Sequence, residues 1–238
     1  MDGLPPMHVI NLDRSTERLR RFRERNGHLQ NILRVPAIDG GALDREALIS
    51  SGYINRDLLY ASGTLGCAMS HLRLWEMAVS QDQSLTIFED DIVIAHQFEK
   101  RAREVMSVLP DDWDIIQWGY GFNPLFVWVD LGVSRVRLHP YGRSAYQGEE
   151  GLQKFQAEEY SAAPVKLLHS FGTQGYSISP KGARAAVEYC LPLRNRLIQF
   201  PYASGSHLTE DSHLRFCTVW FCATLGNAQR NIHSGDAG

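Results

Sequence analysis

Short apolar runs alternate along the chain with longer segments whose apolar residues recur at helical spacing. The runs at Met7 to Leu12, Ile32 to Ile38 and Ser84 to Phe88 have the length and composition of buried strands. Between them, a helix from Asp13 to about Asn26 starts with capping residues and stops before a glycine, and Thr64 to Ser80 carries an apolar stripe. The pattern therefore predicts strands separated by helices.

The rest of the chain extends this alternation, with one exception. A helix from about Gln97 to Leu109 and strands at Trp113 to Trp118 and Tyr176 to Ser179 are predicted, and Pro180 suits the first turn of a later helix. Tyr141 to Pro164 is polar and irregular, which favours a long mobile loop or lid, or plain disorder. Alternating strands and helices indicate an α/β layered fold with a partly parallel sheet, and such sheets bind ligands at the carboxyl ends of their strands.

Composition excludes several classes of protein. The chain has 238 residues, of which 44% are hydrophobic and 21% charged, and this fits a soluble globular protein with a sizeable core. A formal net charge of -3 gives no basic field over the whole molecule, so we predict no nucleic-acid partner. The four cysteines lack zinc-binding spacing and are interpreted as reduced core residues. They are Cys67, Cys190, Cys217 and Cys222.

The first residues predict no secretory leader, and the hydropathy of the sequence predicts no membrane span. Its first residues lack a charged region followed by an apolar one, and no stretch approaches about 18 apolar residues. We therefore predict a cytoplasmic protein, with any membrane contact peripheral and on the inner face. The candidate for that contact is the basic helix 14–25, whose arginines form either a solvated face or a surface that attracts anionic lipid or acidic substrate. Its arginines include Arg18, Arg20, Arg21, Arg23 and Arg25.

Three acidic residues, Glu89, Asp90 and Asp91, directly follow the apolar run that ends at Phe88. Carboxylates this close raise one another's pKa unless a cation or hydrogen-bond donors compensate. Mg²⁺ and Mn²⁺ prefer oxygen ligands and usually take one or two protein carboxylates, with water or substrate phosphate completing the shell. The acidic triplet therefore suggests a metal that holds a phosphorylated ligand, and the alternative is a solvated acidic turn.

A second acidic site, Glu210 and Asp211, follows Thr209 and precedes another apolar segment. Thr209 could cap a helix whose first turn contains both acids, which is a purely structural interpretation. The functional interpretation is that one carboxylate acts as a general base. His233 lies five residues from the end of the sequence, where an unstructured tail is the default.

Four sequence blocks follow one another in the order found in a known family. They are INLDRS at residues 10–15 with Arg18, GTLGCAMSH at 63–71 with Trp75, FEDD at 88–91, and GYSIS at 175–179 with Gly182-Ala183. Together they resemble glycosyltransferase family 25, which contains lipopolysaccharide (lipooligosaccharide) galactosyltransferases and collagen galactosyltransferases. The similarity runs from about residue 7 to 183 and is weaker thereafter.

The resemblance implies a fold and a reaction. It implies a single GT-A-type domain over residues 1–238, with a mixed, mostly parallel central sheet flanked by helices and a Rossmann-like nucleotide-binding half. It also implies a nucleotide-sugar donor, a divalent metal that is usually Mn²⁺, with Mg²⁺ as the alternative, and inversion at the anomeric carbon. The partners implied are a UDP-sugar, with UDP-galactose favoured, and a glycan or lipid-linked acceptor.

The resemblance also assigns roles to residues. Asp91 would bind the metal that bridges the diphosphate, Glu89 would support that shell, and His233 would complete it. Gly172 to Gly175 is similar to the glycine-rich loop of GT-A enzymes. The element that contains Asp211 is similar to the acidic element that supplies the base in inverting members, with Glu210 as the reserve candidate. The implied donor contacts are Asn11, Leu12, Arg14, Arg18, Ser70 and Asp90.

Two other functions use the same features. A metal-dependent hydrolase of nucleotide diphosphate sugars would also need carboxylates and Mg²⁺, although the chain has no second ligand cluster close in sequence to the first. A non-catalytic sugar-nucleotide or glycan-binding protein could keep the fold without turnover. The expected function is transfer of a sugar, galactose favoured, to a hydroxyl of a glycan, lipopolysaccharide or protein-linked acceptor.

Overall fold

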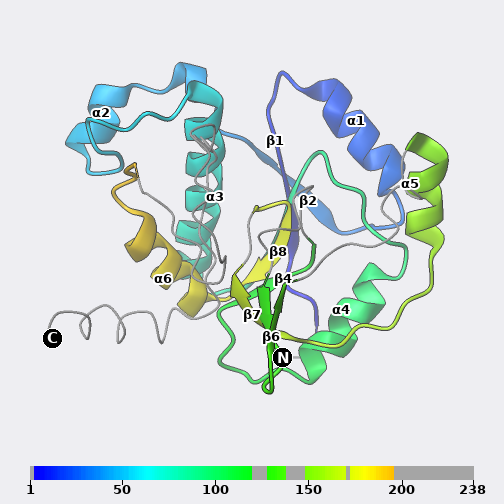
Figure 1. The fold of residues 1–238 in the computed structure, drawn as a ribbon. Helices are drawn as coiled ribbons and strands as arrows, with labels where there is room; N and C mark the ends of the chain where they lie inside the picture. The colour runs from blue at the N-terminus through cyan, green and yellow to red at the C-terminus, as the bar shows by residue number, and fades with distance from the viewer. Residues whose placement is uncertain (1–2, 120–127, 138–147, 170–171, 196–238) are drawn as a thin grey trace, which may run out of the picture.

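The computed structural model describes residues 3–119, 128–137, 148–169 and 172–195 (Figure 1). The first half contains β1 (Met7–Asn11), α1 (Thr16–Arg25), β2 (Ile32–Pro36), the short 3-10 helix η1 (Gly40–Ala42), α2 (Arg45–Ser50), α3 (Ser62–Ser80) and β3 (Leu85–Glu89). It continues with α4 (Phe98–Ser107), β4 (Ile115–Gln117), β5 (Trp128–Asp130), β6 (Arg135–Arg137), α5 (Gly148–Ala157), β7 (Lys166–His169), β8 (Gly175–Ile178) and α6 (Pro180–Cys190).

The described strands form a central sheet in the order β2-β1-β3-β8-β4 and a smaller sheet in the order β6-β5-β7. In the central sheet, β1 pairs in parallel with both β2 and β3, whereas β8 runs antiparallel to β3 and to β4. Four of these strands therefore point the same way and β8 points against them. The predicted α/β fold with a mixed, mostly parallel sheet is confirmed.

Two helical layers cover the central sheet (Figure 1). On one face, residues of α3 and α6 pack against the sheet in a cluster that includes Leu72, Trp75 and Ala183. On the other face, Phe22 of α1 and Phe98 of α4 pack in a second cluster. Each layer buries the apolar stripe of its helices, as expected for a helix that lies on a sheet.

The strands divide their side chains between these two layers with the period of two that a pleated strand imposes. In β3, Leu85 and Ile87 belong to the α3 layer, whereas Phe88 belongs to the α1 layer. In β1, Ile10 belongs to the α3 layer and Val9 to the α1 layer. This alternation decides which way each residue at the strand ends points.

The prediction of a loop over residues 141–164 is wrong for Gly148–Ala157, because these residues form helix α5. Glu149 and Glu150 lie in its first turn, where acids stabilise a helix. Near its other end the buried Gln156 donates through Nε2 to the carbonyls of Arg25 and Ile94, at 2.7 and 2.9 Å. These tertiary contacts are invisible to a local pattern, and a role as a lid stays a prediction.

Helix α2, which the hydrophobic pattern does not predict, begins at a strong cap. The Asp44 side chain accepts from the backbone N–H groups of Glu46 and Ala47, at 2.9 and 3.2 Å. An aspartate that caps two donors favours a helix start over a continued turn. The six-residue helix is too short to give a readable apolar period.

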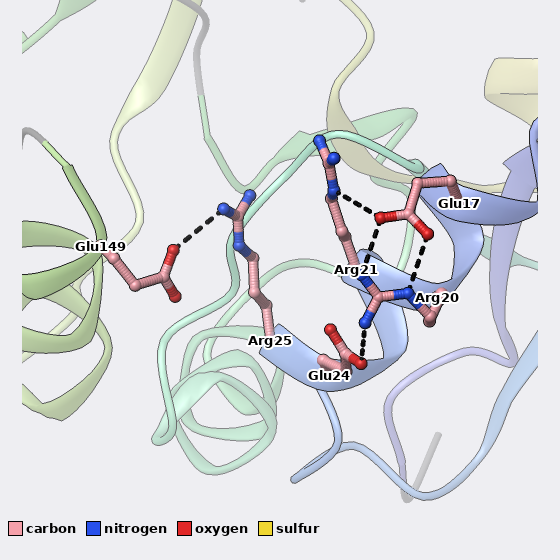
Figure 2. A network of polar contacts seen from close by, with 6 residues as sticks. All are labelled: Glu17, Arg20, Arg21, Glu24, Arg25 and Glu149. Atoms are coloured by element: carbon pink, nitrogen blue, oxygen red, sulfur yellow. Dashed lines mark hydrogen bonds and ion pairs between the residues drawn. The ribbon is translucent and has the colours of Figure 1, made fainter.

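Three of the arginines of α1, Arg20, Arg21 and Arg25, pair with nearby carboxylates (Figure 2). Glu17 accepts from Arg20 Nη2 at 2.7 Å and from Arg21 Nε at 3.1 Å, and Arg20 also pairs with Glu24. These hydrogen bonds, led by that from Arg20, lower the pKa of Glu17 to about 2. Arg25 reaches Glu149 of α5 at 3.1 Å. The helix face is therefore a mixed network, which weakens the case for attraction to anionic lipid.

No helix among the residues that the structure describes has the length and apolar character needed to cross a membrane.

Two glycines let backbones touch where η1 meets α3. A Cβ on Gly66 would lie 2.5 Å from the carbonyl oxygen of Ile38 and 2.6 Å from the amide nitrogen of Gly40. A Cβ on Gly40 would lie 1.7 Å from the carbonyl oxygen of Ser62. The absence of side chains at these two positions lets the chain after β2 lie directly on the helix.

We predict that Gly66→Ala will destabilise the protein by about 1–3 kcal/mol, because overpacking forces backbone to move. Gly63→Ala in the same helix is the matched control. A Cβ on Gly63 meets nothing within 4 Å, and alanine favours a helix by up to about 1 kcal/mol over glycine. Urea unfolding of both variants checks this, and equal effects would contradict the close-contact explanation.

Candidate functional site

The candidate site lies where the carboxyl ends of β1 and β3 meet. The parallel register pairs Ile10 with Glu89, so Asn11 at the end of β1 adjoins the acidic triplet at the end of β3. The first residues of β8 lie beside this edge, because β8 is antiparallel and pairs Gly175 with Phe88. Residues distant in sequence are thus brought to one sheet edge, the usual ligand-binding edge of such folds.

Asp90 faces the α1 layer and is 8% exposed. One of its oxygens, Oδ2, accepts from Asn11 Nδ2 at 2.6 Å. The other, Oδ1, pairs with the guanidinium of Arg18, which also lies 3.2 Å from Asp91 Oδ2. Donors and one cation therefore compensate part of the triplet's charge within the protein.

Asn11 is only 2% exposed, and the protein itself occupies its polar atoms. Besides Asp90, its Nδ2 donates to the carbonyl of Ser15 at 3.1 Å, and its Oδ1 accepts from Arg34 Nε at 3.1 Å. Because both amide hydrogens are used, Asn11 ties β1, β2 and the start of α1 to Asp90. As a donor-nucleotide contact Asn11 stays a prediction, and the geometry favours a supporting role.

Glu89 faces the opposite layer, toward α3, as the alternation along β3 requires. Its Oε1 accepts from Thr173 Oγ1 at 2.5 Å and lies 3.5 Å from Nε2 of His71. Burial alone would raise the pKa of Glu89, but His71 and Thr173 outweigh burial and hold this pKa below its ordinary value. Glu89 and Asp90 thus avoid mutual repulsion because they point to different sides of the sheet.

The predicted glycine-rich turn, Gly172 to Gly175, lies directly against Glu89. The backbone N–H of Glu89 donates to the carbonyl of Gln174 at 3.0 Å. Gly172 has a φ of 104°, a conformation that favours glycine. This turn presents the hydroxyl of Thr173 to Glu89 and so lies next to the acidic triplet. Its likeness to the glycine-rich loop of GT-A enzymes stays a prediction.

Behind Glu89 lies a buried polar chain that the sequence pattern does not indicate. The ring of His71 is 1% exposed, and its Nδ1 lies 2.8 Å from the hydroxyl of Tyr176. Trp75 Nε1 donates to the same hydroxyl at 2.8 Å. Burial opposes protonation of His71, but neighbouring Cys67 and Glu89 raise its pKa to about 9.

Asp91 is the most solvent-accessible carboxylate of the triplet, with 59% of its side chain exposed. Although much of the side chain is exposed, partial desolvation of its carboxyl group and then the charge of Glu89 raise the pKa of Asp91. The ionised form of Asp91 is therefore less stable than in water, and a bound cation would stabilise it. Its hard oxygen donors and its position at the sheet edge suit Mg²⁺ or Mn²⁺.

The segment after the triplet is held in place by side chains that sequence reasoning missed. Asn26, 2% exposed, accepts from the N–H of Ile94 at 2.8 Å and donates to the carbonyl of Ile92 at 3.1 Å. Gln156 of α5 binds the carbonyl of Ile94, as described above. These contacts fix the chain that leaves Asp91, and only the burial of two amide side chains in the folded protein reveals them.

The other predicted residues fall into three groups: two near the sheet edge, one buried, and three outside the described residues. Arg14 is 62% exposed and pairs with Asp39, and Leu12 follows the end of β1, so both lie near the sheet edge. Ser70 is 1% exposed, and its hydroxyl binds the N–H of Ile38 at 2.8 Å and the carbonyl of Gly66 at 2.7 Å. Ser70 therefore ties the segment between β2 and η1 to α3, while contact with a nucleotide stays a prediction. Glu210, Asp211 and His233 lie outside the described residues.

Among the residues that the structure describes, one group of three side chains could hold a cation. It consists of Cys67, His71 and Glu89, whose ligand atoms all lie within 4.8 Å of one another. Asp91, the predicted metal ligand, does not belong to this group. Neither Cys67 nor Cys190 forms a disulfide, which agrees with the reduced state predicted for them.

We predict that Asn11→Ala will lower the free energy of unfolding by about 3 kcal/mol. The substitution breaks a buried network and leaves both the Asp90 carboxylate and the Arg34 guanidinium short of a partner. The exposed Asn31 supplies the control, since Asn31→Ala should change stability by less than about 0.5 kcal/mol. Urea unfolding measures both, and a small effect at Asn11 would show that the network does not hold the strand ends together.

A second prediction concerns pH. Because the pKa of His71 rises from 6.5 to about 9 on folding, its stabilisation should be complete below pH 6.5 and disappear as pH rises through 9. The free energy of unfolding of chelator-treated protein should fall by up to about 3 kcal/mol over that interval. Urea unfolding across this range should show a smaller decline in His71→Gln, and an identical decline would assign the titration to another group.

The chain matches known proteins over most of its length. The family described as "Glycosyltransferase family 25 (LPS biosynthesis protein)" matches residues 4–201. "Procollagen galactosyltransferase 2" of Homo sapiens is 29% identical over 204 residues, which cover 78% of this chain and 28% of that protein. "Lipooligosaccharide biosynthesis protein lex-1" of Haemophilus influenzae is 25% identical over 138 residues, which cover 57% of this chain and 39% of that protein.

Some similar proteins are named as inactive. "Inactive glycosyltransferase 25 family member 3" of Homo sapiens is 26% identical over 210 residues, which cover 82% of this chain and 30% of that protein. The chain thus spans only about a third of the length of these relatives. The family match, which extends from before β1 to beyond α6, includes every described residue of the site. This chain belongs to glycosyltransferase family 25.

Proposed function

We propose that this protein is a metal-dependent, inverting glycosyltransferase that moves a sugar, galactose favoured, from a UDP-sugar to an acceptor hydroxyl. The observation that carries the proposal is the convergence of Arg18, Asp90 and Asp91 at the carboxyl ends of β1 and β3. A cation and two carboxylates at such an edge suit a phosphorylated ligand and its metal. The family match and the relative named as a galactosyltransferase support the same reaction class.

Asp91 is the residue we propose as the main metal ligand. It is the exposed member of the triplet, and its raised pKa reflects a charge that lacks full compensation. Glu89 would support the shell from the α3 side, and His233 is the proposed third member. A divalent ion such as Mn²⁺ would neutralise charge that develops on the departing diphosphate.

The donor's diphosphate would be met by Arg18 and Arg14. Half of the Arg18 side chain is exposed, and 62% of that of Arg14. Guanidinium groups bind phosphate oxygens in pairs and stay charged at any working pH. Arg18 already joins Asp90 to Asp91, so an incoming diphosphate would compete for it and free carboxylate oxygens. Asp90 is the proposed contact to ribose or sugar.

We propose Asp211 as the general base that deprotonates the acceptor hydroxyl, with Glu210 in reserve. Attack would come from the face opposite the leaving diphosphate, so the anomeric carbon is inverted in one displacement. No covalent sugar intermediate is needed. The acceptor class is a glycan, lipopolysaccharide or protein-linked hydroxyl, in line with the relatives named for lipooligosaccharide biosynthesis and procollagen. We place the reaction in the cytoplasm, with any membrane contact peripheral.

A non-catalytic sugar-nucleotide-binding protein is the second candidate, because some relatives are named inactive. A hydrolase of nucleotide sugars is the third. Incubation with UDP-galactose, Mn²⁺ and a panel of glycan acceptors separates these functions by their products. Transfer supports the proposed function, free galactose with UDP alone indicates a hydrolase, and binding without turnover indicates the inactive alternative.

We predict that Mn²⁺ with UDP-galactose will raise the melting temperature of the wild-type protein. The Asp91→Asn variant should lose the part of this rise that depends on Mn²⁺. A ligand at 100 times its Kd adds about 2.7 kcal/mol to the stability of a folded protein. Asp111→Asn, at an exposed acid outside the site, should respond like the wild type. Thermal melts with and without Mn²⁺ measure this, and an unchanged shift in Asp91→Asn would remove Asp91 from the metal shell.

Asp211→Asn should preserve that thermal shift but slow transfer by about 10²-fold or more, the usual scale for a general base. Product formation at saturating donor measures the loss. Turnover equal to that of the wild type would show that Asp211 is not the general base, and Glu210 would then be the candidate.

A further inference from the structure

We propose that Cys67, His71 and Glu89 form a second cation site, selective for a borderline-soft divalent metal of the Zn²⁺ class. The three ligand atoms, one sulfur, one nitrogen and one oxygen, lie within 4.8 Å of one another. They come from two elements, since Cys67 and His71 belong to α3 and Glu89 ends β3. The site shares Glu89 with the metal shell proposed above for the donor diphosphate, but adds a sulfur and a nitrogen ligand.

The helix supplies two of the ligands from one face. Cys67 and His71 are four residues apart on α3, so their side chains lie one above the other along one stripe. Pairs of ligands at this spacing on a helix recur in zinc proteins. The strand supplies the third, because the alternation along β3 turns Glu89 toward the same helix.

A buried atom without a hydrogen bond is the observation that points to a ligand. Nε2 of His71 is fully buried and makes no hydrogen bond within the described part of the chain. Its ion-pair contact with Glu89 Oε1, at 3.5 Å, is longer than a hydrogen bond. Buried ring nitrogens of histidine are normally hydrogen-bonded, and this one lies beside a carboxylate. A cation between the three groups would satisfy it.

The ring is also held as a metal ligand would be. Its other nitrogen, Nδ1, meets the hydroxyl of Tyr176 at 2.8 Å, and Trp75 Nε1 anchors that hydroxyl at 2.8 Å. Metal-binding histidines almost always use their second nitrogen in this way, which fixes both the tautomer and the ring orientation. Thr173 orients Glu89 in the same manner, through its hydroxyl at 2.5 Å.

The donor set and its spacing favour Zn²⁺ over Mn²⁺ or Mg²⁺. Zinc accepts thiolate, imidazole and carboxylate in a tetrahedral shell, whereas the harder ions prefer oxygen alone. Bonds of about 2.0–2.1 Å in that geometry place the ligand nitrogen and oxygen roughly 3.3 Å apart. The observed 3.5 Å between His71 and Glu89 is close to this value. Cys67 is half-buried and a quarter of the Glu89 side chain is exposed, so an ion can enter.

Binding of Co²⁺ to the full chain tests the proposal without any sugar donor, so its failure is distinct from failure of the proposed transferase function. After chelator treatment, Co²⁺ should give the near-ultraviolet absorption of a thiolate-to-cobalt charge transfer, with one equivalent bound, and Zn²⁺ should displace it. Cys190→Ala, at a buried cysteine of α6, is the matched control and should keep the band. Cys67→Ala should lose it.

A third variant tests the orientation of the ring. Tyr176→Phe keeps all three ligands and removes only the hydroxyl behind His71, so Co²⁺ affinity should fall by about 10–100-fold. Circular dichroism confirms that each variant is folded. Absence of a charge-transfer band in folded wild-type protein, or its retention in Cys67→Ala, would overturn the proposal and leave a hydrogen-bonded cluster without metal.

Discussion

The hydrogen bond between Asn11 and Asp90 joins the carboxyl ends of the two central parallel strands, and the arrangement of the site depends on it. Both side chains are buried, and the bond is 2.6 Å long. Asn11 has no unused hydrogen, and it also reaches the start of α1 and the Arg34 side chain on β2. One amide therefore sets the relative positions of four elements, β1, β2, β3 and α1, that frame the proposed donor site.

The division of the acidic triplet between two layers follows from the same strand ends. Asp90 faces α1 and receives Arg18, whereas Glu89 faces α3 and receives Thr173. Three carboxylates can sit in sequence because the sheet separates two of them and exposes the third. The three acids are adjacent in sequence, but in the folded protein each has different surroundings.

Much of the fold could be predicted from the sequence, because local patterns determine it. β1, α1, α3, β3 and α6 have apolar runs or helical apolar periods that need no distant partner, and the structure confirms these elements. Of the three helices, only α6 begins with a side-chain cap, from Ser179. Helix α5 could not be predicted from the sequence, because Gln156 meets its partners only when the chain around Arg25 and Ile94 has folded. Taken alone, the polar sequence around Gln156 predicts a loop.

The site was predictable where motif and strand end coincide, as at the acidic triplet, and not where burial gives a residue its role. His71 and Cys67 look like ordinary residues of an apolar helix until β3 brings Glu89 beside them. Asn26 likewise gains meaning only from the segment that follows Asp91.

The contact of Gly40 with Gly66 has a mechanical consequence. Backbone meets backbone there with no side chain between, so the separation of η1 and α3 cannot change by a change of rotamer. His71 lies five residues further, about 7.5 Å along the axis and near the middle of the helix. The contact of the two glycines therefore fixes the depth at which α3 presents the His71 ring to Glu89.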